Sequence, residues 1–404
     1  MTVIQRGDTL PDMKLRPFVL TLLVVVALSA LAVKAQRGGQ DPRTDPFQGL
    51  TTDGTVQTGL FAIRATGVPT RPVVQAAEAF IGALTPEQRK KTTFPVDDVE
   101  WRQWNNVHRA MRAGVSFREM TDPQRRRAFD LLGAGLSAKG LEKARNVMKL
   151  NETIAEIRNN FEEYGEGLYH LTVMGEPSSS QPWGWQLEGH HLIVHYFVLG
   201  DQVVMTPTFM GSEPVIAESG KYVGTKVLQE EQAKGLALMQ ALTPEQRAKA
   251  TIEAGKKMVN KAQAQAFRDN LQLPYAGLEV SELNEKQKAL LTDVIAEYVT
   301  NMDDGHAKVR MEEVRAHLSD TYFGWIGESG SDSVFYYRIH SPVILIEFDH
   351  QTPVALPGPK EPNRQHIHSV VRTPNGNDYG KDLLRQHYEK HKGDPAHGHA
   401  RAPL

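Results

Sequence analysis

Apolar positions along the chain follow a helical spacing in some segments and a strand spacing in others. A group of helical segments is followed by a group of strand segments, and this order occurs twice. Apolar residues at i, i+3 and i+4 predict helices at 71–83, 122–134, 138–161, 228–241, 281–300 and 304–317. Short apolar or alternating runs predict strands at 169–175, 182–188, 190–199, 202–210, 321–327, 334–340, 342–349 and 365–372, and a last helix is expected at 378–391. Pro207 within one of these runs predicts a bulge or a sheet edge.

Two pairs of similar segments suggest that the chain is internally repeated. "ALTPEQRKKTT" at 83–93 returns as "ALTPEQRAKAT" at 241–251, each with a threonine N-cap, a proline and the glutamine of a capping box. "GEPSSSQPWGWQLEGHHLIVHYF", which starts at residue 175, matches "GESGSDSVFYYRIHSPVILIEFD", which starts at 327. We therefore expect an α+β fold of two duplicated halves, about 71–225 and 226–392, each a helical segment followed by an antiparallel β meander.

The amino-terminal segment has the composition of an export signal. Residues 13–35 begin with two basic residues, Lys14 and Arg16, and continue with an apolar run of about 16 residues and a small-residue exit, which together predict a signal peptide cleaved after Ala35. A retained membrane anchor is the alternative, although the run is shorter than the roughly 20 residues of a typical span. Residues 36–70, rich in Gly, Thr and Pro, are expected to form an extended or disordered leader. We predict an exported protein, periplasmic or extracellular, with no stable membrane insertion after cleavage.

Composition narrows the classes of function. The chain has 46 basic and 48 acidic residues, so it has no positive excess that would favour nucleic acid. It has no cysteine, which excludes disulfides, thiolate metal sites and a cysteine nucleophile. The histidine-containing tail at 393–404 is rich in Pro and Gly and is expected to be disordered.

The candidate chemistry lies in three strands that are apolar except for histidines and carboxylates. The segment "LEGHHLIVHYFV" carries His190, His191 and His195. Its counterpart "PVILIEFDH" carries Glu347, which the repeat places at the same position as His195. A buried carboxylate needs a cation, a proton or a metal, because an unpaired buried charge is costly. We expect Glu347 to lie within hydrogen-bond or metal-bridging reach of a histidine, with a structural salt bridge to an arginine as the alternative.

A third strand, "NRQHIHSVVR", places His366 and His368 two residues apart and therefore on one face. Two imidazoles so spaced can bind one metal ion, and Arg372 lies on the same face. We predict His190, His191, His366 and His368 as metal ligands, with Glu347 and Arg372 as catalytic residues. Each residue also has a structural interpretation, since buried histidines often bond backbone carbonyls.

Several separated motifs resemble one known family. "PWGWQLEGHHL", "TPTFMG", "FYYRIHSPVILIEFD" and "HIHSVVRTPNGNDYGKDLLRQHY" together resemble the family called domain of unknown function 3500, over roughly residues 70–392. The resemblance implies an exported or cell-envelope protein of this repeated α+β type, and it implies no established activity. The blocks that match contain His190, His191, Glu347, His366, His368, Arg372, Asp378 and His387.

Two functional hypotheses follow from these observations. The first is an exported metalloenzyme that uses a divalent transition metal (Zn, Cu, Fe or Mn) for hydrolysis, or for oxidation at iron or copper. The second is a non-catalytic cell-envelope protein that binds a small molecule or an envelope component, with a His/Glu network that is structural. Nucleophile elbows, phosphate-binding loops and H-E-x-x-H helices are absent from the sequence.

Overall fold

The structure, a computed structural model, describes residues 45–257 and 261–392. The predicted signal peptide (13–35), the start of the leader (36–44) and the histidine-containing tail (393–404) lie outside the described residues. Residues 45–70 contain no helix, and their one strand-like contact is a parallel bridge between Thr51 and Gln272. This segment is nevertheless packed, because Leu50 and Thr51 are buried.

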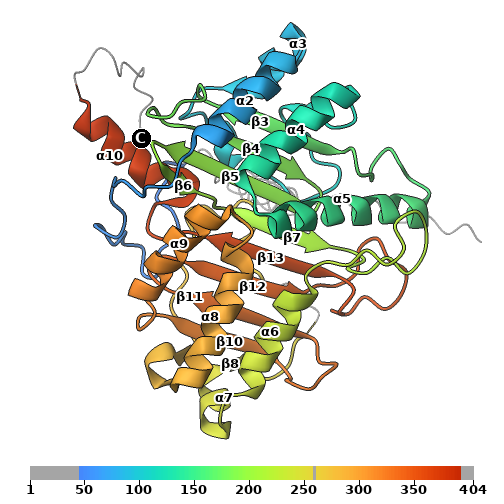
Figure 1. Cartoon of the computed structure of the whole chain (residues 1–404). Coiled ribbons are helices and arrows are strands. Elements are labelled where there is room, and N and C mark those ends of the chain that lie inside the picture. The colour runs from blue at the N-terminus through green and yellow to red at the C-terminus, as the bar shows by residue number, and fades with distance from the viewer. Residues whose placement is uncertain (1–44, 258–260, 393–404) are drawn as a thin grey trace, which may run out of the picture. The chain divides into compact units, whose positions relative to one another are not determined.

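The helices confirm the periodicity of the sequence to within a few residues (Figure 1). Their bounds are α2 (Arg71–Ala83), α3 (Pro86–Thr92), α4 (Asp122–Gly135), α5 (Ala138–Arg158), α6 (Gln229–Gln240), α7 (Pro244–Ala250), α8 (Glu285–Val299), α9 (Asp304–Ala316) and α10 (Lys381–Lys390). The short helices α3 and α7 were not predicted as elements, although their N-caps were. A single 3-10 turn at Asp378–Gly380 precedes α10, so the last helix begins later than expected.

The two similar capping motifs make the same contacts in both places. Thr85 and Gln88 form a complete capping box at the start of α3, and Thr243 and Gln246 form one at the start of α7. The amide groups of these glutamines also bond a glutamine of the following long helix, Gln124 in α4 and Gln287 in α8. The two segments are alike because each begins a helix with the same capping side chains.

One mixed sheet of 13 strands carries most of the predicted site residues. Its strands are β1 (Thr93–Phe94), β2 (Val115–Ser116), β3 (Tyr169–Met174), β4 (Trp183–Gly189), β5 (Leu192–Leu199), β6 (Gln202–Val204), β7 (Thr208–Ser212), β8 (Thr251–Glu253), β9 (Leu278–Glu279), β10 (Tyr322–Gly327), β11 (Phe335–His340), β12 (Leu345–His350) and β13 (Ile367–Arg372). The main order is β1-β3-β4-β5-β7-β13-β12-β11-β10-β8. The predicted strand 202–210 is divided into β6 and β7 around Pro207, as its proline suggested.

The strand order places β7 and β13 together at the middle of the sheet, where they pair antiparallel. Two meanders, β3-β4-β5 and β10-β11-β12, lie on either side of this pair with antiparallel neighbours throughout. The strands that carry His195 and Glu347, β5 and β12, are not adjacent, because β7 and β13 separate them. The strand that carries His368, β13, pairs directly with the Glu347 strand, β12.

The two faces of this sheet are covered differently. On one face the helices pack over a large apolar cluster that includes Trp185, Tyr196, Trp325, Tyr337 and Phe348. Figure 1 shows α6 and α8 lying across the strands of the second meander on this side. We call this the helix face. Among the described residues no helix combines the length and apolar character needed to cross a bilayer.

The other face is covered mainly by loops, and a second apolar cluster there joins Phe197, Phe209 and Leu345 to Leu383 and Leu384 of α10. We call it the loop face. Residues that share it can be read from the strand register, because directly paired residues in an antiparallel sheet project to the same side. His368 pairs with Asp349 on one neighbour and with Gly211 on the other. The loop face therefore carries both the histidines of β13 and the carboxylates of β12.

Candidate metal centre

Three of the predicted histidines converge on the loop face of the sheet. His191 lies in the two-residue connection between β4 and β5, and His366 and His368 lie at the start of β13. Their Nε2 atoms are 3.1 Å apart for His191 and His368, 3.3 Å for His366 and His191, and 3.0 Å for His366 and His368. Residues 175 positions apart in the chain are thus brought to one point.

These separations fit three ligands of one metal ion. Metal–nitrogen bonds of about 2.0–2.1 Å at tetrahedral or octahedral angles place neighbouring nitrogens about 2.9–3.4 Å apart. The three histidines form a group whose ligand atoms can hold a metal ion, and each of them is buried. Only His191, His366 and His368 form such a group among the described residues.

Hydrogen bonds on the far side of two rings decide which nitrogen faces the centre. His366 Nδ1 donates to the carbonyl of Thr352 at 2.8 Å, and His368 Nδ1 donates to Gln265 Oε1 at 3.2 Å. Burial lowers the pKa of both imidazoles and that of His191, so the neutral forms are favoured. A neutral ring that donates through Nδ1 presents a lone pair at Nε2, which is the form a metal requires.

Gly211 in β7 makes room for the two rings. An added Cβ at this position would lie 3.1 Å from Cδ2 of His191 and 3.1 Å from Cδ2 of His368. It would also lie 2.7 Å from the carbonyl oxygen of Ile367, a contact that a side chain cannot make without backbone movement. The strand therefore needs glycine here for the imidazoles to converge.

Glu213, just beyond the end of β7, supports the site from behind. One of its carboxylate oxygens lies 3.5 Å from His366 Nδ1. The same carboxylate accepts hydrogen bonds from the backbone N–H groups of Val354, Ala355 and Leu356 at 2.7–3.0 Å. It thereby ties the loop that supplies the Thr352 carbonyl to the end of the strand.

His190 lies beside this group but is not a member of it. Its Nδ1 is 2.8 Å from Asn151 Oδ1, and its ring stacks on His191 with centroids 3.9 Å apart. The predicted strand 190–199 begins at Leu192, so His190 and His191 occupy a turn rather than opposite faces of a strand. Three of the four predicted ligands are brought together, and the stacked His190 orients the ring of His191.

Glu347 is fully buried but contacts no histidine through a hydrogen bond. Its carboxylate accepts from the backbone N–H of Gln263 at 3.0 Å and of Ala264 at 2.7 Å, and from the hydroxyl of Tyr336 at 2.6 Å. Burial raises its pKa, which these hydrogen bonds partly oppose. We expected Glu347 within hydrogen-bond or metal-bridging reach of a histidine. The carboxylate instead bonds a loop that the strand pattern could not reveal, and it is not a member of the three-histidine group.

Asp349, two residues further along β12, holds the same loop. Its Oδ2 accepts from the backbone N–H of Lys261 at 2.8 Å and of Ala262 at 3.1 Å, and its Oδ1 pairs with Lys256 Nζ at 2.9 Å. The two carboxylates on neighbouring loop-face positions thus anchor consecutive peptide groups of residues 261–264.

Arg372 completes the attachment of this loop at its other end. Its Nε donates to the carbonyl of Ala264 at 2.8 Å, and its guanidinium also pairs with Asp269 and Asp378 at 3.2 Å each. The side chain is fully buried among these partners. Arg372, predicted as catalytic, fixes the loop whose Gln265 bonds His368.

Sequence reasoning missed Gln265, Glu213 and Asp269. Gln265 and Asp269 lie in a segment without regular secondary structure, so periodicity gave no reason to place them near the histidines. Asp349 was visible in the motif "IEFD", where its position two residues after Glu347 indicated the same face.

Comparisons with known proteins agree with the resemblance seen in the sequence motifs. Neither the curated proteins nor the solved structures contain a match to this chain. Residues 66–381 match the model of a family described as "Protein of unknown function (DUF3500)". That match covers helices α2 to α9, the whole sheet and all three converging histidines, so the chain belongs to the DUF3500 family.

Proposed function

We propose that this protein is a metal-dependent enzyme whose site is formed by His191, His366 and His368. The observation that carries the proposal is the convergence of three Nε2 atoms within 3.0–3.3 Å of one another, on buried imidazoles with lowered pKa values. Lone pairs directed at one point repel each other, and a cation at that point removes the repulsion. Three imidazoles and no thiolate suit zinc, copper, iron or manganese.

The reaction class follows from the number of ligands. Three protein ligands leave at least one coordination position for water or substrate, which is the pattern of catalytic rather than structural zinc sites. Such an ion supplies an activated water for hydrolysis, or electron transfer if it is iron or copper. The protein's own contribution is the fixed orientation of the rings by Thr352, Gln265 and Glu213.

A second candidate function is non-catalytic binding of a small molecule or an envelope component. The burial of all three histidines favours it, since each is less than 10% exposed. Glu347, Asp349 and Arg372 also have structural partners for their charged groups. In this alternative the histidine group and the loop network stabilise a surface that recognises a partner.

We further propose that the protein is exported and that its two halves arose by duplication. The basic, apolar and small-residue order of residues 13–35 supports export. The two capping networks and the strand order, which runs inward from both sheet edges to β7 and β13, support duplication.

Metal analysis of the purified protein tests the proposal. We expect close to one equivalent of a first-row transition metal after exposure to Zn²⁺, Cu²⁺, Fe²⁺ or Mn²⁺, and its loss in the His366→Ala, His368→Ala double variant. His317→Ala is the matched control, because His317 is the C-cap residue of α9 and lies outside the group. Wild-type protein that remains metal-free and as stable as before would support the binding protein instead.

Activity assays on the metal-loaded protein separate the two functions. Panels of ester, phosphoester, glycoside and peptide substrates, and oxidation of phenols with O₂, cover the hydrolytic and oxidative reactions. Turnover that depends on the metal and disappears in the double variant is the expected result. Stoichiometric metal without turnover in any assay would leave the binding function as the better account.

A further inference from the structure

A cavity lies on the helix face of the sheet, behind the histidine group. The central strands β7 and β13 build both sites, because their side chains alternate between the two faces. Gly211 and His368 pair on the loop face, whereas Met210 and Ser369 pair on the helix face. Met210, Ser369 and Val371 line the cavity, so it is separated from the three histidines by the sheet itself.

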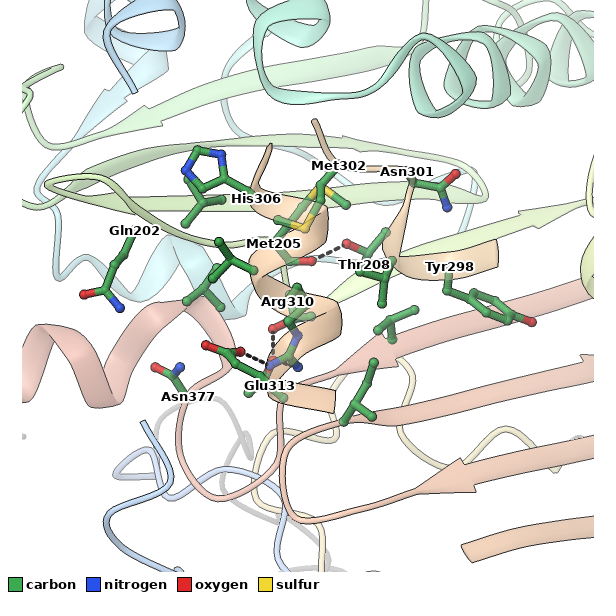
Figure 2. A pocket seen from close by; sticks show the side chains of 18 of the residues that line it. Gln202, Met205, Thr208, Tyr298, Asn301, Met302, His306, Arg310, Glu313 and Asn377 are labelled. Atoms are coloured by element: carbon green, nitrogen blue, oxygen red, sulfur yellow. Dashed lines mark hydrogen bonds and ion pairs between the residues drawn. The ribbon is translucent and has the colours of Figure 1, made fainter. Parts of the chain in front are cut away.

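The walls come from segments far apart in the chain. Figure 2 shows His306 and Arg310 of α9, Met302 and Asn301 before it, and Met205 of the β6–β7 connection around the cavity. The cavity volume is about 60 Å³. At roughly 10–15 Å³ for each water centre, this space accepts four to six waters, or one small organic molecule.

Charged groups in the wall are paired with one another. Arg310 donates to Glu313 at 2.8 Å, as the dashed line in Figure 2 shows, and to the carbonyl of Val343 at 2.7 Å. His306 bonds Asp303 at 2.8 Å through Nδ1 and the carbonyl of Asp201 at 3.1 Å through Nε2. A ligand that carried a net charge would need to break these pairs, so the wall favours a neutral molecule.

Hydrogen-bonding capacity in the wall is mainly accepting. The hydroxyl of Thr208 donates to the carbonyl of Met205 at 2.7 Å, and that of Ser369 donates to the carbonyl of Met210 at 2.7 Å. Each of these hydroxyl oxygens keeps a lone pair that can accept a hydrogen bond from a donor on a ligand.

The apolar part of the wall suits a flat ring. Met205, Met210 and Met302 enter it from three different segments, and Phe61 adds an aromatic edge. Methionine side chains adapt their shape and make favourable sulfur–aromatic contacts.

We propose that this cavity is a second ligand site, which binds a small uncharged molecule with an aromatic ring and a hydroxyl donor, a compound of the phenol class. The metal of the proposed site cannot reach such a ligand through the sheet, so the cavity is a site for binding rather than for the reaction at the histidines. The inference uses none of the three histidines and does not depend on the proposed function.

Fluorine NMR of 4-fluorophenol with the full-length protein tests this site. We expect a saturable change of the ¹⁹F signal, with a dissociation constant in the millimolar range or below for a ligand of about eight non-hydrogen atoms. Fluorobenzene, which lacks the donor, is expected to bind at least fivefold more weakly. Val371→Phe fills the cavity from β13 and should abolish binding, and Thr208→Val, which removes an accepting hydroxyl, should weaken it at least fivefold.

Val223→Phe is the matched control, since Val223 is 64% exposed and is not part of the wall. Circular dichroism and thermal melting establish that each variant is folded before it is titrated. Binding that is absent in the wild type, or equal in Val371→Phe and in Val223→Phe, would overturn the proposal. Metal content measured on the same samples shows whether the histidine site succeeds or fails independently.

Discussion

The two faces of one sheet bury their residues by different physical means. On the helix face, stacked rings such as Tyr337 and Phe348, with centroids 5.0 Å apart, lie under amphipathic helices. On the loop face, one residue away along the same strand, Glu347 is just as buried but bonds the peptide groups of a loop. Burial alone therefore does not distinguish the core from the site.

The difference shows where precision is required. Apolar contacts tolerate small shifts, whereas a buried carboxylate must meet its donors within about 0.3 Å of an ideal distance. Glu347, Asp349 and Arg372 hold residues 261–269 in one position, and that position puts Gln265 against His368. Irregular backbone thus becomes part of the candidate metal centre.

The largest effect on stability is expected from the helix face. Phe348→Ala should lower the free energy of unfolding by about 3–5 kcal/mol, because it leaves a cavity among stacked rings. Metal affinity of the folded fraction should change less than threefold. Chemical denaturation and titration with a metal-sensitive chelator measure the two quantities, and a large loss of affinity would show that the faces are not separable.

A smaller loss of stability but a larger effect on the metal is expected from Glu347→Gln. The variant weakens hydrogen bonds to two peptide N–H groups, which should cost about 1.5–3 kcal/mol. It should also weaken metal binding roughly tenfold, because the loop carrying Gln265 loosens. Glu282→Gln, at an exposed pair with Lys249, is the control and should change neither quantity. Unchanged metal affinity in a destabilised Glu347→Gln protein would make the carboxylate purely structural.

The pH dependence of stability should have opposite signs at two buried groups, one on each face. Burial lowers the pKa of His350 to about 3 and raises that of Glu188 to about 7. The unfolded chain binds more protons at His350 below pH 6.5, so this residue lowers stability as pH falls. The folded chain binds more protons at Glu188 between about pH 4.5 and 7, so this residue lowers stability as pH rises.

Single glutamine variants isolate these two contributions. When the pH falls from 7 to 5, His350 should cost the wild type about 2 kcal/mol of stability, and His350→Gln should remove that loss. Over the same fall in pH, Glu188 should add about 2 kcal/mol of stability to the wild type, and Glu188→Gln should remove that gain. Urea denaturation at both pH values measures each difference, and two slopes of the same sign would contradict this assignment of charge states.

The smallest effect on the metal is expected at His190. Because its ring stacks on His191 and its Nδ1 bonds Asn151, His190→Gln should weaken metal binding less than tenfold. His191→Gln, the adjacent substitution, removes a ligand and should weaken it by about a hundredfold or more. Equal effects of the two variants would restore His190 as a ligand.

Periodicity was sufficient for the long elements of this protein. The stripe of apolar residues in α5 and the alternating runs of β3, β4, β10 and β11 set both the kind of element and nearly all of its bounds. The HxH motif identified two of the three converging histidines directly, because spacing along one strand determines which side chains share a face. The similar segments that start at 175 and 327 also suggested that Glu347 corresponds to His195 in position.

Tertiary structure alone decided which groups meet. The sequence contains no information in its local pattern about the hairpin turn that brings His191 to β13, or about a loop whose peptide groups bind Glu347 and Asp349. Local spacing determines the direction of a side chain relative to its own backbone. The neighbour of a side chain across the sheet depends on strand order and on the loops that cover the strands. These loops bond through their backbone, so one residue type serves there as well as another. Strand order and loops therefore decide whether a side chain is a candidate metal ligand or a structural anchor.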